Sequence, residues 1–381
     1  MNTIYADYNA TTPLDPEVRA AMNEALDVSF GNPSSIHQAG QAARRLVDRA
    51  RAQVAGLIGA APDEIVFTSG GTEADNLAVL GVAGAATGER RGMVTSAVEH
   101  KAVLDPCAYL QEQGRAVTFL PVDGDGRVEI AAAEGVATSD VALFSVMLAN
   151  NDTGTLQPVA EIVHAAQACG ALVHSDAVQA AGKVPIDVKK LGVSLLSFSS
   201  HKIHGPKGAG ALFVRYGVRL APLVRGGRQE RTLRPGTENV PAIVGFGKAC
   251  DLARARLEAD ARRVAELRDH FEKQVLARIP GTRVNGGDHR LPNTSNIAFD
   301  RLDGEAITIN LDMLGIAVST GAACNSADKT PSHVLVAMGQ SAACARSSVR
   351  FSFGRDTTDE EIDRAVNLVV SAVKLLREAR P

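Results

Sequence analysis

The chain has 381 residues, with 40 Lys and Arg against 43 Asp and Glu and a net charge of -3 at pH 7. This length is enough for about two domains with a large apolar core, and it excludes the small scaffolds that depend on disulfides or metal ions. The balanced charge disfavours nucleic acid and anionic membranes as partners, and the scarcity of aromatic residues, at 4% with no Trp, favours a small-molecule enzyme over a base-stacking platform.

Between about residues 16 and 220, apolar runs typical of buried strands alternate with amphipathic helical stretches. This alternation predicts an α/β fold with a mostly parallel sheet covered by helices. The seven expected strands are Glu64–Thr68, Gly92–Ser96, Val117–Leu120, Val141–Met147, Ala171–Ser175, Leu195–Ser199 and Gly210–Val214.

A long helical pattern follows over Val240–Arg278, with apolar residues at three- and four-residue steps, and it is long enough to bridge two domains. After Pro280 the sequence takes on an α+β character. It ends in a helix over residues 362–376, which Thr358 and Glu361 introduce as a capping box. We place a domain boundary near residue 255.

The run SGGTEADN at residues 69–76 leads from a predicted strand through glycines into a helix. Free N–H groups at a helix N-terminus and closely approachable glycine backbone make a phosphate cradle. The alternative is an ordinary strand-to-helix turn in which Thr72 and Asp75 form a capping box. The spacing matches neither a P-loop nor a dinucleotide fingerprint.

Two further predicted strands end in polar residues that carry chemistry. Asp176 follows the predicted strand Ala171–Ser175 and could hold a cationic ring nitrogen or cap a helix. Lys202 follows the next strand and could form a Schiff base or lie in a surface turn. A phosphate cradle, an Asp and a Lys at the carboxyl edge of one sheet are together what pyridoxal phosphate (PLP) requires.

The five cysteines form no Cys-x-x-Cys pair, and no signal peptide or apolar run of about 20 residues is visible, so a cytoplasmic protein without a membrane span is expected. Cys324 lies in the small-residue loop TGAACNSADK and is a candidate reactive thiol. Cys344 is a weaker second candidate, and the other three cysteines lie in apolar or helical stretches as small core residues.

These motifs resemble the PLP-dependent cysteine desulfurases of the NifS/IscS type, within the class V aminotransferase family. The resemblance covers nearly the whole chain and implies a fold-type I homodimer. Its large PLP-binding domain would span residues 13–255, and a smaller α+β domain of residues 1–12 and 256–381 would carry the catalytic Cys loop. The matching runs are YADYNATTPLDP, FGNPSSIHQAG, TSGGTEADN, EHKAVLDP, HSDAVQ, SSHKIHGPKGAG, RPGTENVP, TGAACNSAD and SSVRFSFGR.

The resemblance implies three catalytic residues. Lys202 would bind the cofactor and carry protons with His100, which would stack on the cofactor ring; an isolated His is otherwise a structural residue. Cys324 would attack the sulfur of L-cysteine and hold it as a persulfide, while L-alanine leaves.

The resemblance also implies a binding role for each remaining site residue. Asp176 would pair with the ring nitrogen, Gln179 with the ring hydroxyl, and Asn151 would lie beside the ring and the substrate. Arg350 would clamp the substrate carboxylate, although a strand-end Arg can also simply pair with an acid. The phosphate would be held by the N–H of Gly71, by Thr72, Ser199 and His201, and by Thr237 from the partner subunit. No metal site is expected.

The sulfur would pass to an acceptor or iron–sulfur scaffold protein, for cluster assembly or thiolation. A selenocysteine lyase or another class V aminotransferase is the alternative, and an aminotransferase needs no reactive Cys324. Because the sequence ends at Pro381, without the tail that housekeeping members extend toward a scaffold, a specialised sulfur-donor role is expected. Asn325 and Asp328 depart from the usual loop residues, and the added acid is expected to raise the pKa of Cys324 or to tune acceptor choice.

Overall fold

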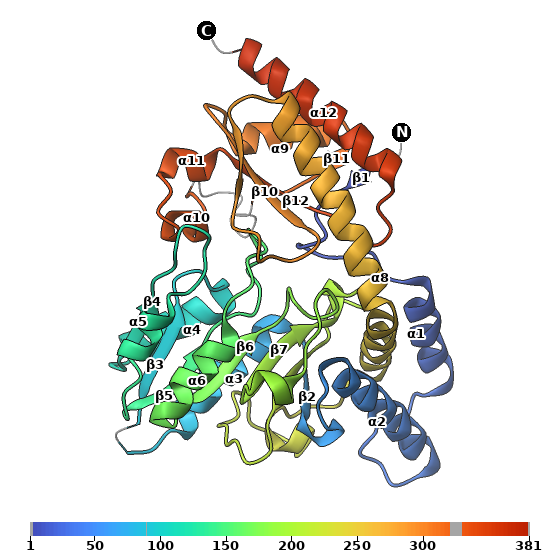
Figure 1. Ribbon diagram of the computed structural model, residues 1–381. Helices are drawn as coiled ribbons and strands as arrows, with labels where there is room; N and C mark the ends of the chain where they lie inside the picture. The colour runs from blue at the N-terminus through green and yellow to red at the C-terminus, as the bar shows by residue number, and fades with distance from the viewer. Residues whose placement is uncertain (1–2, 89, 321–329, 380–381) are drawn as a thin grey trace.

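The computed structural model describes residues 3–88, 90–320 and 330–379 (Figure 1). A seven-stranded sheet has the strand order β2-β8-β7-β6-β5-β3-β4. As the described residues define this sheet, β8 alone runs in the direction opposite to the other six strands. The predicted mostly parallel sheet is therefore confirmed. Its strands are β2 (Ile65–Thr68), β3 (Gly92–Ser96), β4 (Val117–Leu120), β5 (Val141–Ser145), β6 (Leu172–Asp176), β7 (Leu195–Ser199) and β8 (Gly210–Val214).

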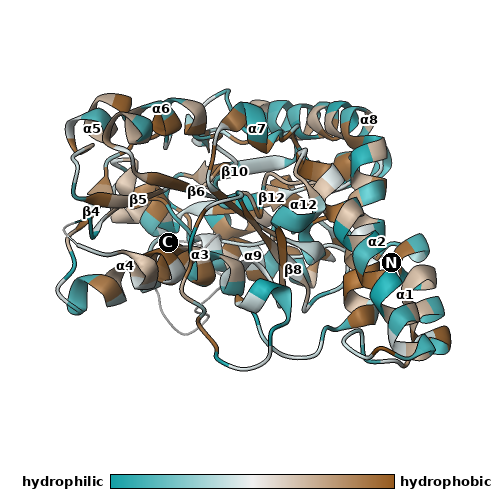
Figure 2. Ribbon diagram, turned by 90° about the horizontal axis from the view of Figure 1, so that it is seen from below, coloured by the Kyte–Doolittle hydropathy of each residue, from teal (hydrophilic) through white to brown (hydrophobic). Residues whose placement is uncertain are grey.

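Helices cover both faces of this sheet. Successive residues of a strand point to opposite faces, so Val66 and Phe67 of β2 enter different apolar cores. The face with Val66 is covered by α3 and α4, and the face with Phe67 by α2, α6 and the first part of α8 (Figure 2). Burial on both faces explains why the strands are continuous apolar runs. The helices up to this point are α1 (Pro16–Val28), α2 (Gln38–Ile58), α3 (Gly71–Ala85), α4 (Lys101–Glu112), α5 (Ile130–Gly135), α6 (Val159–Cys169), α7 (Val188–Leu191) and α8 (Val240–Arg278).

A separate apolar core lies in the C-terminal part of the chain and includes Ile4 from the N-terminal segment. It is built on a three-stranded antiparallel sheet in the order β12-β10-β9, and β1 pairs in parallel with β11 nearby. Residues near the two ends of the chain therefore lie together (Figure 1). The elements are β1 (Ile4–Tyr5), β9 (Thr282–Asn285), β10 (Thr294–Phe299), α9 (Gly304–Met313), β11 (Ile316–Ala317), α10 (His333–Ala337), α11 (Ala342–Arg346), β12 (Ser348–Ser352) and α12 (Asp359–Glu378).

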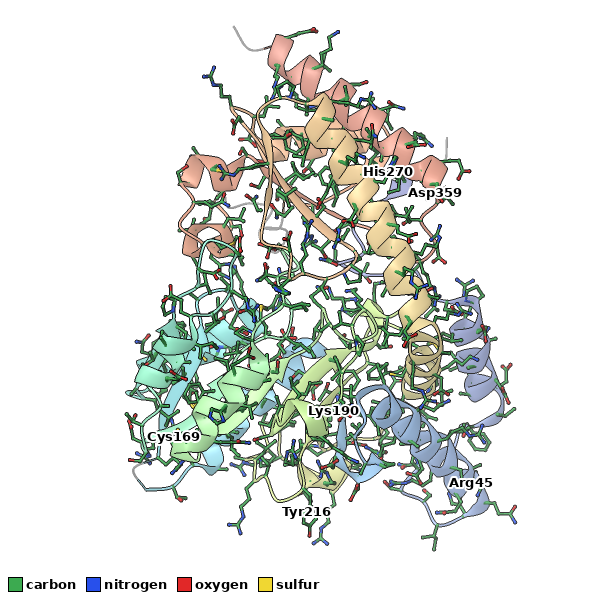
Figure 3. The ribbon with its side chains drawn as sticks, viewed as in Figure 1. Arg45, Cys169, Lys190, Tyr216, His270 and Asp359 are labelled. Atoms are coloured by element: carbon green, nitrogen blue, oxygen red, sulfur yellow. The ribbon has the colours of Figure 1, made fainter. Side chains whose placement is uncertain are left out.

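The 39-residue helix α8 has the predicted bounds. It contributes Phe246 to the core on the Phe67 face of the main sheet and Phe271 to the C-terminal core. Its second part packs along α12, where His270 lies near the first turn of α12 (Figure 3). The predicted capping box of Thr358 and Glu361 is confirmed at the start of α12. The domain boundary near residue 255 falls inside α8 and stays a prediction. Across the described residues, no helix is both long and apolar enough to cross a membrane.

Candidate active site

A pocket of about 220 Å³ lies at the carboxyl ends of β2, β5, β6 and β7, the edge at which open α/β sheets bind ligands. It brings together nine residues singled out from the sequence. Three residues that were not singled out as site residues, Asp75, Met147 and Val178, also line it. The nine are Gly71, Thr72, His100, Asn151, Asp176, Gln179, Ser199, His201 and Lys202.

One end of the pocket is formed by the N-terminus of α3. Gly70 is the N-cap and no side chain caps the helix, so the suggested capping box of Thr72 and Asp75 is wrong. A Cβ on Gly71 would lie 2.6 Å from Val178 Cγ2, so the close packing here requires glycine. The uncapped N–H groups therefore stay available to an anion.

Ser199, the last residue of β7, lines the same pocket, and Ser200 follows it without lining the pocket. Ser199 Oγ and Ser200 Oγ are buried and have no hydrogen-bond partner among the described residues. Burial, followed by the charge of Lys202, lowers the pKa of His201 to about 4, so its ring is neutral near pH 7. A buried hydroxyl without a partner is costly unless a ligand supplies one.

Asp176 ends β6 and is buried, and its Oδ1 accepts from the backbone N–H of Val178 at 2.8 Å. It is not a helix cap. Burial raises the pKa of Asp176, while the hydrogen bond from Val178 and the charge of Lys202 act in the opposite direction. Burial and then the charge of Asp176 raise the pKa of Asp75 well above its ordinary value. Of these two carboxyl groups, Asp75 therefore holds a proton more readily.

A row of buried polar side chains supports this strand end from the neighbouring strands. His174 Nδ1 lies 2.8 Å from Ser145 Oγ, and its Nε2 lies 2.9 Å from Ser197 Oγ. Burial lowers the pKa of His174 to about 3, so this ring is neutral.

Asp75 was not singled out from the sequence as a site residue. Its one signal is that it is an acid four residues after Gly71 within an apolar helical stretch, and the apparent capping pattern with Thr72 conceals that signal.

Lys202 lies in a short 3-10 turn directly after β7. Its Nζ donates to two backbone carbonyls of the N-terminal segment, Asn9 O at 2.5 Å and Ala10 O at 2.8 Å. Gln179 Nε2 also donates to Asn9 O, at 2.9 Å. The N-terminal segment thus positions the amine and the amide at one wall of the pocket, a contact that local sequence patterns do not indicate.

His100 has a structural role and also lines the pocket. It is the N-cap of α4, with Nδ1 accepting from Ala102 N at 3.1 Å, and its ring lines the pocket. Because Nδ1 accepts, the neutral ring carries its proton on Nε2.

Arg350 of β12 lies beside the pocket and is buried. Its Nη2 donates to Asp7 Oδ1 at 2.7 Å and its Nη1 to the carbonyl of Asn151 at 3.1 Å. Nε has no hydrogen-bond partner among the described residues. The strand-end pairing with an acid is therefore present, and the guanidinium also reaches a residue that lines the pocket.

Among the described residues, Thr237 does not line the pocket. Thr237 is exposed in the loop before α8, and its neighbour Arg234 is tied to α3 by a 3.0 Å contact with Glu73. Its expected contact with a partner subunit stays a prediction. Cys324 lies outside the described residues.

The other cysteines differ in accessibility. Cys107 and Cys250 are buried, and burial raises the pKa of both thiols, that of Cys107 to about 12. Cys169 ends α6, just before the start of β6, at the sheet edge opposite the pocket (Figure 3). Cys344 is half-buried, with its Sγ 2.5 Å from Arg283 Nη2.

The chain is similar to known proteins over nearly its whole length. The Aminotransferase class-V family model matches residues 4–365. A cysteine desulfurase of Cereibacter sphaeroides is 50% identical, over all of this chain and 98% of its own length. A solved NifS-like protein is 37% identical with a TM-score of 0.93, over 98% of this chain and 100% of its own. SspA, solved in complex with cysteine, is 36% identical with a TM-score of 0.83, over 93% of this chain and 100% of its own.

The chain therefore belongs to the class V aminotransferase family, whose members include PLP enzymes. Within that family it groups with the cysteine desulfurases of the NifS/IscS type, as expected from its motifs.

Proposed function

We propose that the protein is a PLP-dependent cysteine desulfurase that converts L-cysteine to L-alanine and takes up the sulfur as a persulfide on Cys324. One observation carries this proposal: Lys202, Asp176 and His100 line a single pocket next to the uncapped N-terminus of α3. The cysteine desulfurases among its relatives extend over nearly the whole chain.

The pocket fits both the phosphate and the ring of PLP. Ser199 Oγ is buried and lacks a partner among the described residues, beside the anion-binding end of α3, so a phosphate would satisfy it. In the same pocket Asp176 supplies a buried carboxyl group for a protonated ring nitrogen. Gly71, Thr72, Ser199 and His201 would hold the phosphate, and Lys202 would bind the cofactor covalently. When bound, PLP supplies a conjugated ring that accepts the electron pair from the substrate Cα.

The residues around the ring would perform the remaining tasks. Gln179 and Asn151 would orient the ring and the substrate, and the guanidinium of Arg350 would hold the substrate carboxylate. Lys202 Nζ would take the proton from the substrate Cα, and His100 Nε2 would return a proton during the reaction.

The sulfur transfer uses the thiolate of Cys324. Its Sγ attacks the sulfur of L-cysteine, a new S–S bond forms, and the Cβ–S bond breaks. After protonation of Cβ, the products are L-alanine and a Cys324 persulfide, so L-cysteine and one thiol give L-alanine and one persulfide. The persulfide would then pass to an acceptor or iron–sulfur scaffold protein.

We further propose a homodimer in which Thr237 reaches the phosphate in the partner subunit. The exposed position of Thr237 supports this assignment. The C-terminal core, which holds Ile4 together with residues from Val264 onward, supports a division into a large domain of residues 13–255 and a small domain of residues 1–12 and 256–381.

The test is L-alanine formation from L-cysteine under a thiol reductant, with wild type, Cys324→Ser and the matched control Cys344→Ser. We expect wild type and Cys344→Ser to form L-alanine and Cys324→Ser to form almost none while it still binds PLP. Equal turnover in all three proteins would contradict the persulfide mechanism and favour a lyase or an aminotransferase. Loss in Cys344→Ser alone would move the sulfur carrier to Cys344.

A further inference from the structure

Asp152 has a buried side chain that links its own loop to β12 and to the start of α10. Its Oδ1 accepts from Asn151 Nδ2 at 2.7 Å and lies 3.8 Å from Arg350 Nη1. Its Oδ2 accepts from Ser332 Oγ at 2.6 Å. The side chain of Asp152 is 3% exposed, so bulk water and salt screen these interactions little.

Ser332 lies on the C-terminal side of the chain segment that contains Cys324. It is the N-cap of α10, and the next residue, His333, places Nε2 2.9 Å from the backbone carbonyl of Glu99. Glu99 directly precedes His100 in the sequence. The C-terminal side of the Cys324 segment is therefore attached to two loops that also carry pocket residues.

The N-terminal side of the same segment is attached to the strand that carries Arg350. Ser319 and Arg350 exchange two backbone hydrogen bonds, of 3.2 and 2.6 Å. Asp152 thus lies between the guanidinium on one side of the segment and Ser332 on the other.

The two oxygens of Asp152 contact different residues. Oδ1 faces Asn151 and Arg350, which belong to the substrate side of the pocket, and Oδ2 holds Ser332. Hydrogen bonds to a charged acceptor are strong and directional. A shift of Asp152 therefore alters its contacts with Asn151 and Arg350 as well as the one with Ser332, whereas loss of the Ser332 hydroxyl removes only the last of these.

We propose that Asp152 is a positioning residue that fixes the substrate-binding side chains relative to the attachment of the Cys324 segment. This inference rests on the proposed function, because Cys324 and Arg350 must act on the same amino acid for their alignment to matter. Asp152 itself touches neither the substrate nor the thiol in this scheme.

Four holoenzymes test the proposal: wild type, Asp152→Asn, Ser332→Ala and the control Asp140→Asn. Asp140 is an exposed carboxylate that accepts from Thr138 Oγ1, so its variant has the same chemical change outside the site. Two quantities are measured: the dissociation constant of the product L-alanine from the change in cofactor absorbance, and the single-turnover rate of persulfide formation on the Cys324 peptide by mass spectrometry.

We expect Asp152→Asn to weaken L-alanine binding and to slow persulfide formation, each about tenfold, the usual effect of losing a hydrogen bond to a charged group. Ser332→Ala should slow persulfide formation only, and the two effects on that rate should be less than additive in the double variant. Asp140→Asn should change neither quantity.

The proposal is overturned if Asp152→Asn matches Asp140→Asn in both quantities, or if Ser332→Ala weakens L-alanine binding as much as Asp152→Asn does. A wild type that forms no Cys324 persulfide would overturn the proposed function instead, and L-alanine binding alone would then decide the role of Asp152. Asp152→Glu keeps the charge and should recover part of both quantities. It replaces Asp152→Asn in the comparison if that variant does not fold.

Discussion

The side chain of His174 contacts that of Asp75, with His174 Nε2 3.5 Å from Asp75 Oδ1. His174 belongs to the strand that ends at Asp176, and both side chains are buried. The pair is not an ion pair, because burial keeps the pKa of His174 at about 3 and raises the pKa of Asp75. Burial also raises the pKa of Asp176, but the hydrogen bond from Val178 and the charge of Lys202 oppose that rise, so Asp176 is the better site of the two for a negative charge. Two carboxyl groups line the pocket, and only one of them suits a protonated ring nitrogen.

This assignment predicts different outcomes for two Asp to Asn changes. Asp176→Asn should lower kcat for L-alanine formation by about 100-fold or more, because a neutral amide does not stabilise the charged ring nitrogen. Asp75→Asn should lower it by less than about fivefold, because an amide resembles the protonated carboxyl group. An Asp75→Asn variant as inactive as Asp176→Asn would show that Asp75 carries the charge.

The serine without a partner gives a prediction on cofactor affinity. Ser199→Ala should weaken PLP binding about tenfold and leave the stability of the cofactor-free protein unchanged, since Ser199 Oγ has no partner among the described residues. Ser197→Ala, on the same strand, is the matched control. It removes the partner of His174 Nε2 and should destabilise the cofactor-free protein. PLP titration and urea unfolding of both variants measure the two effects, and the reverse pattern would remove Ser199 from the phosphate site.

Arg350→Lys should raise KM for L-cysteine about tenfold or more with a smaller loss of kcat, because an ammonium group does not form two parallel hydrogen bonds to a carboxylate. Arg290→Lys is the control, since Arg290 holds Glu272 through two hydrogen bonds of 2.7 and 2.6 Å. The control should lose stability and keep its KM. Steady-state kinetics on both variants decide, and a normal KM in Arg350→Lys would assign the arginine to Asp7 alone.

Lys183 predicts a dependence of stability on pH. Its Nζ donates to Gln179 Oε1 at 3.0 Å, and burial, followed by the charges of Lys202 and Arg350, lowers its pKa to about 7. Between about pH 7 and its ordinary value of 10.5, the unfolded chain holds a proton here that the folded protein lacks. Stability from this group therefore rises with pH across that window.

The stability of wild type relative to Lys183→Met should accordingly rise by roughly 1.4 kcal/mol per pH unit from about pH 7 upward. Urea unfolding of both proteins at several pH values measures it, and groups common to both cancel in the difference. Parallel pH profiles would mean that Lys183 keeps an ordinary pKa in the folded protein.

The sheet and the long helix could be predicted from the sequence because local patterns determine them. The strands are buried on both faces and read as continuous apolar runs, and α8 keeps its apolar spacing through two cores. The phosphate cradle, Asp176 and Lys202 followed from patterns at strand ends, because the carboxyl ends of parallel strands meet at one edge. The other expected pocket residues followed from the resemblance to a known family.

The rest depends on contacts between distant parts of the chain. The spacing of Thr72 and Asp75 matches a capping box. In the folded protein Gly70 is the N-cap instead, and Asp75 lines the pocket. The contacts of Lys202 with Asn9 and of Asp152 with Ser332 join segments more than a hundred residues apart, and no local pattern indicates such pairs.

The N-terminal segment has a consequence for biosynthesis. Asn9 accepts from Lys202 and is itself held by Thr294 and by Ser352, near the end of the chain. A nascent chain on the ribosome folds its earlier parts first, and the main sheet is complete once Val214 has emerged. The carbonyl that orients the lysine is fixed only after β12 is available. The lysine of a nascent chain therefore gains its final environment late in translation, after the sheet beneath it has formed.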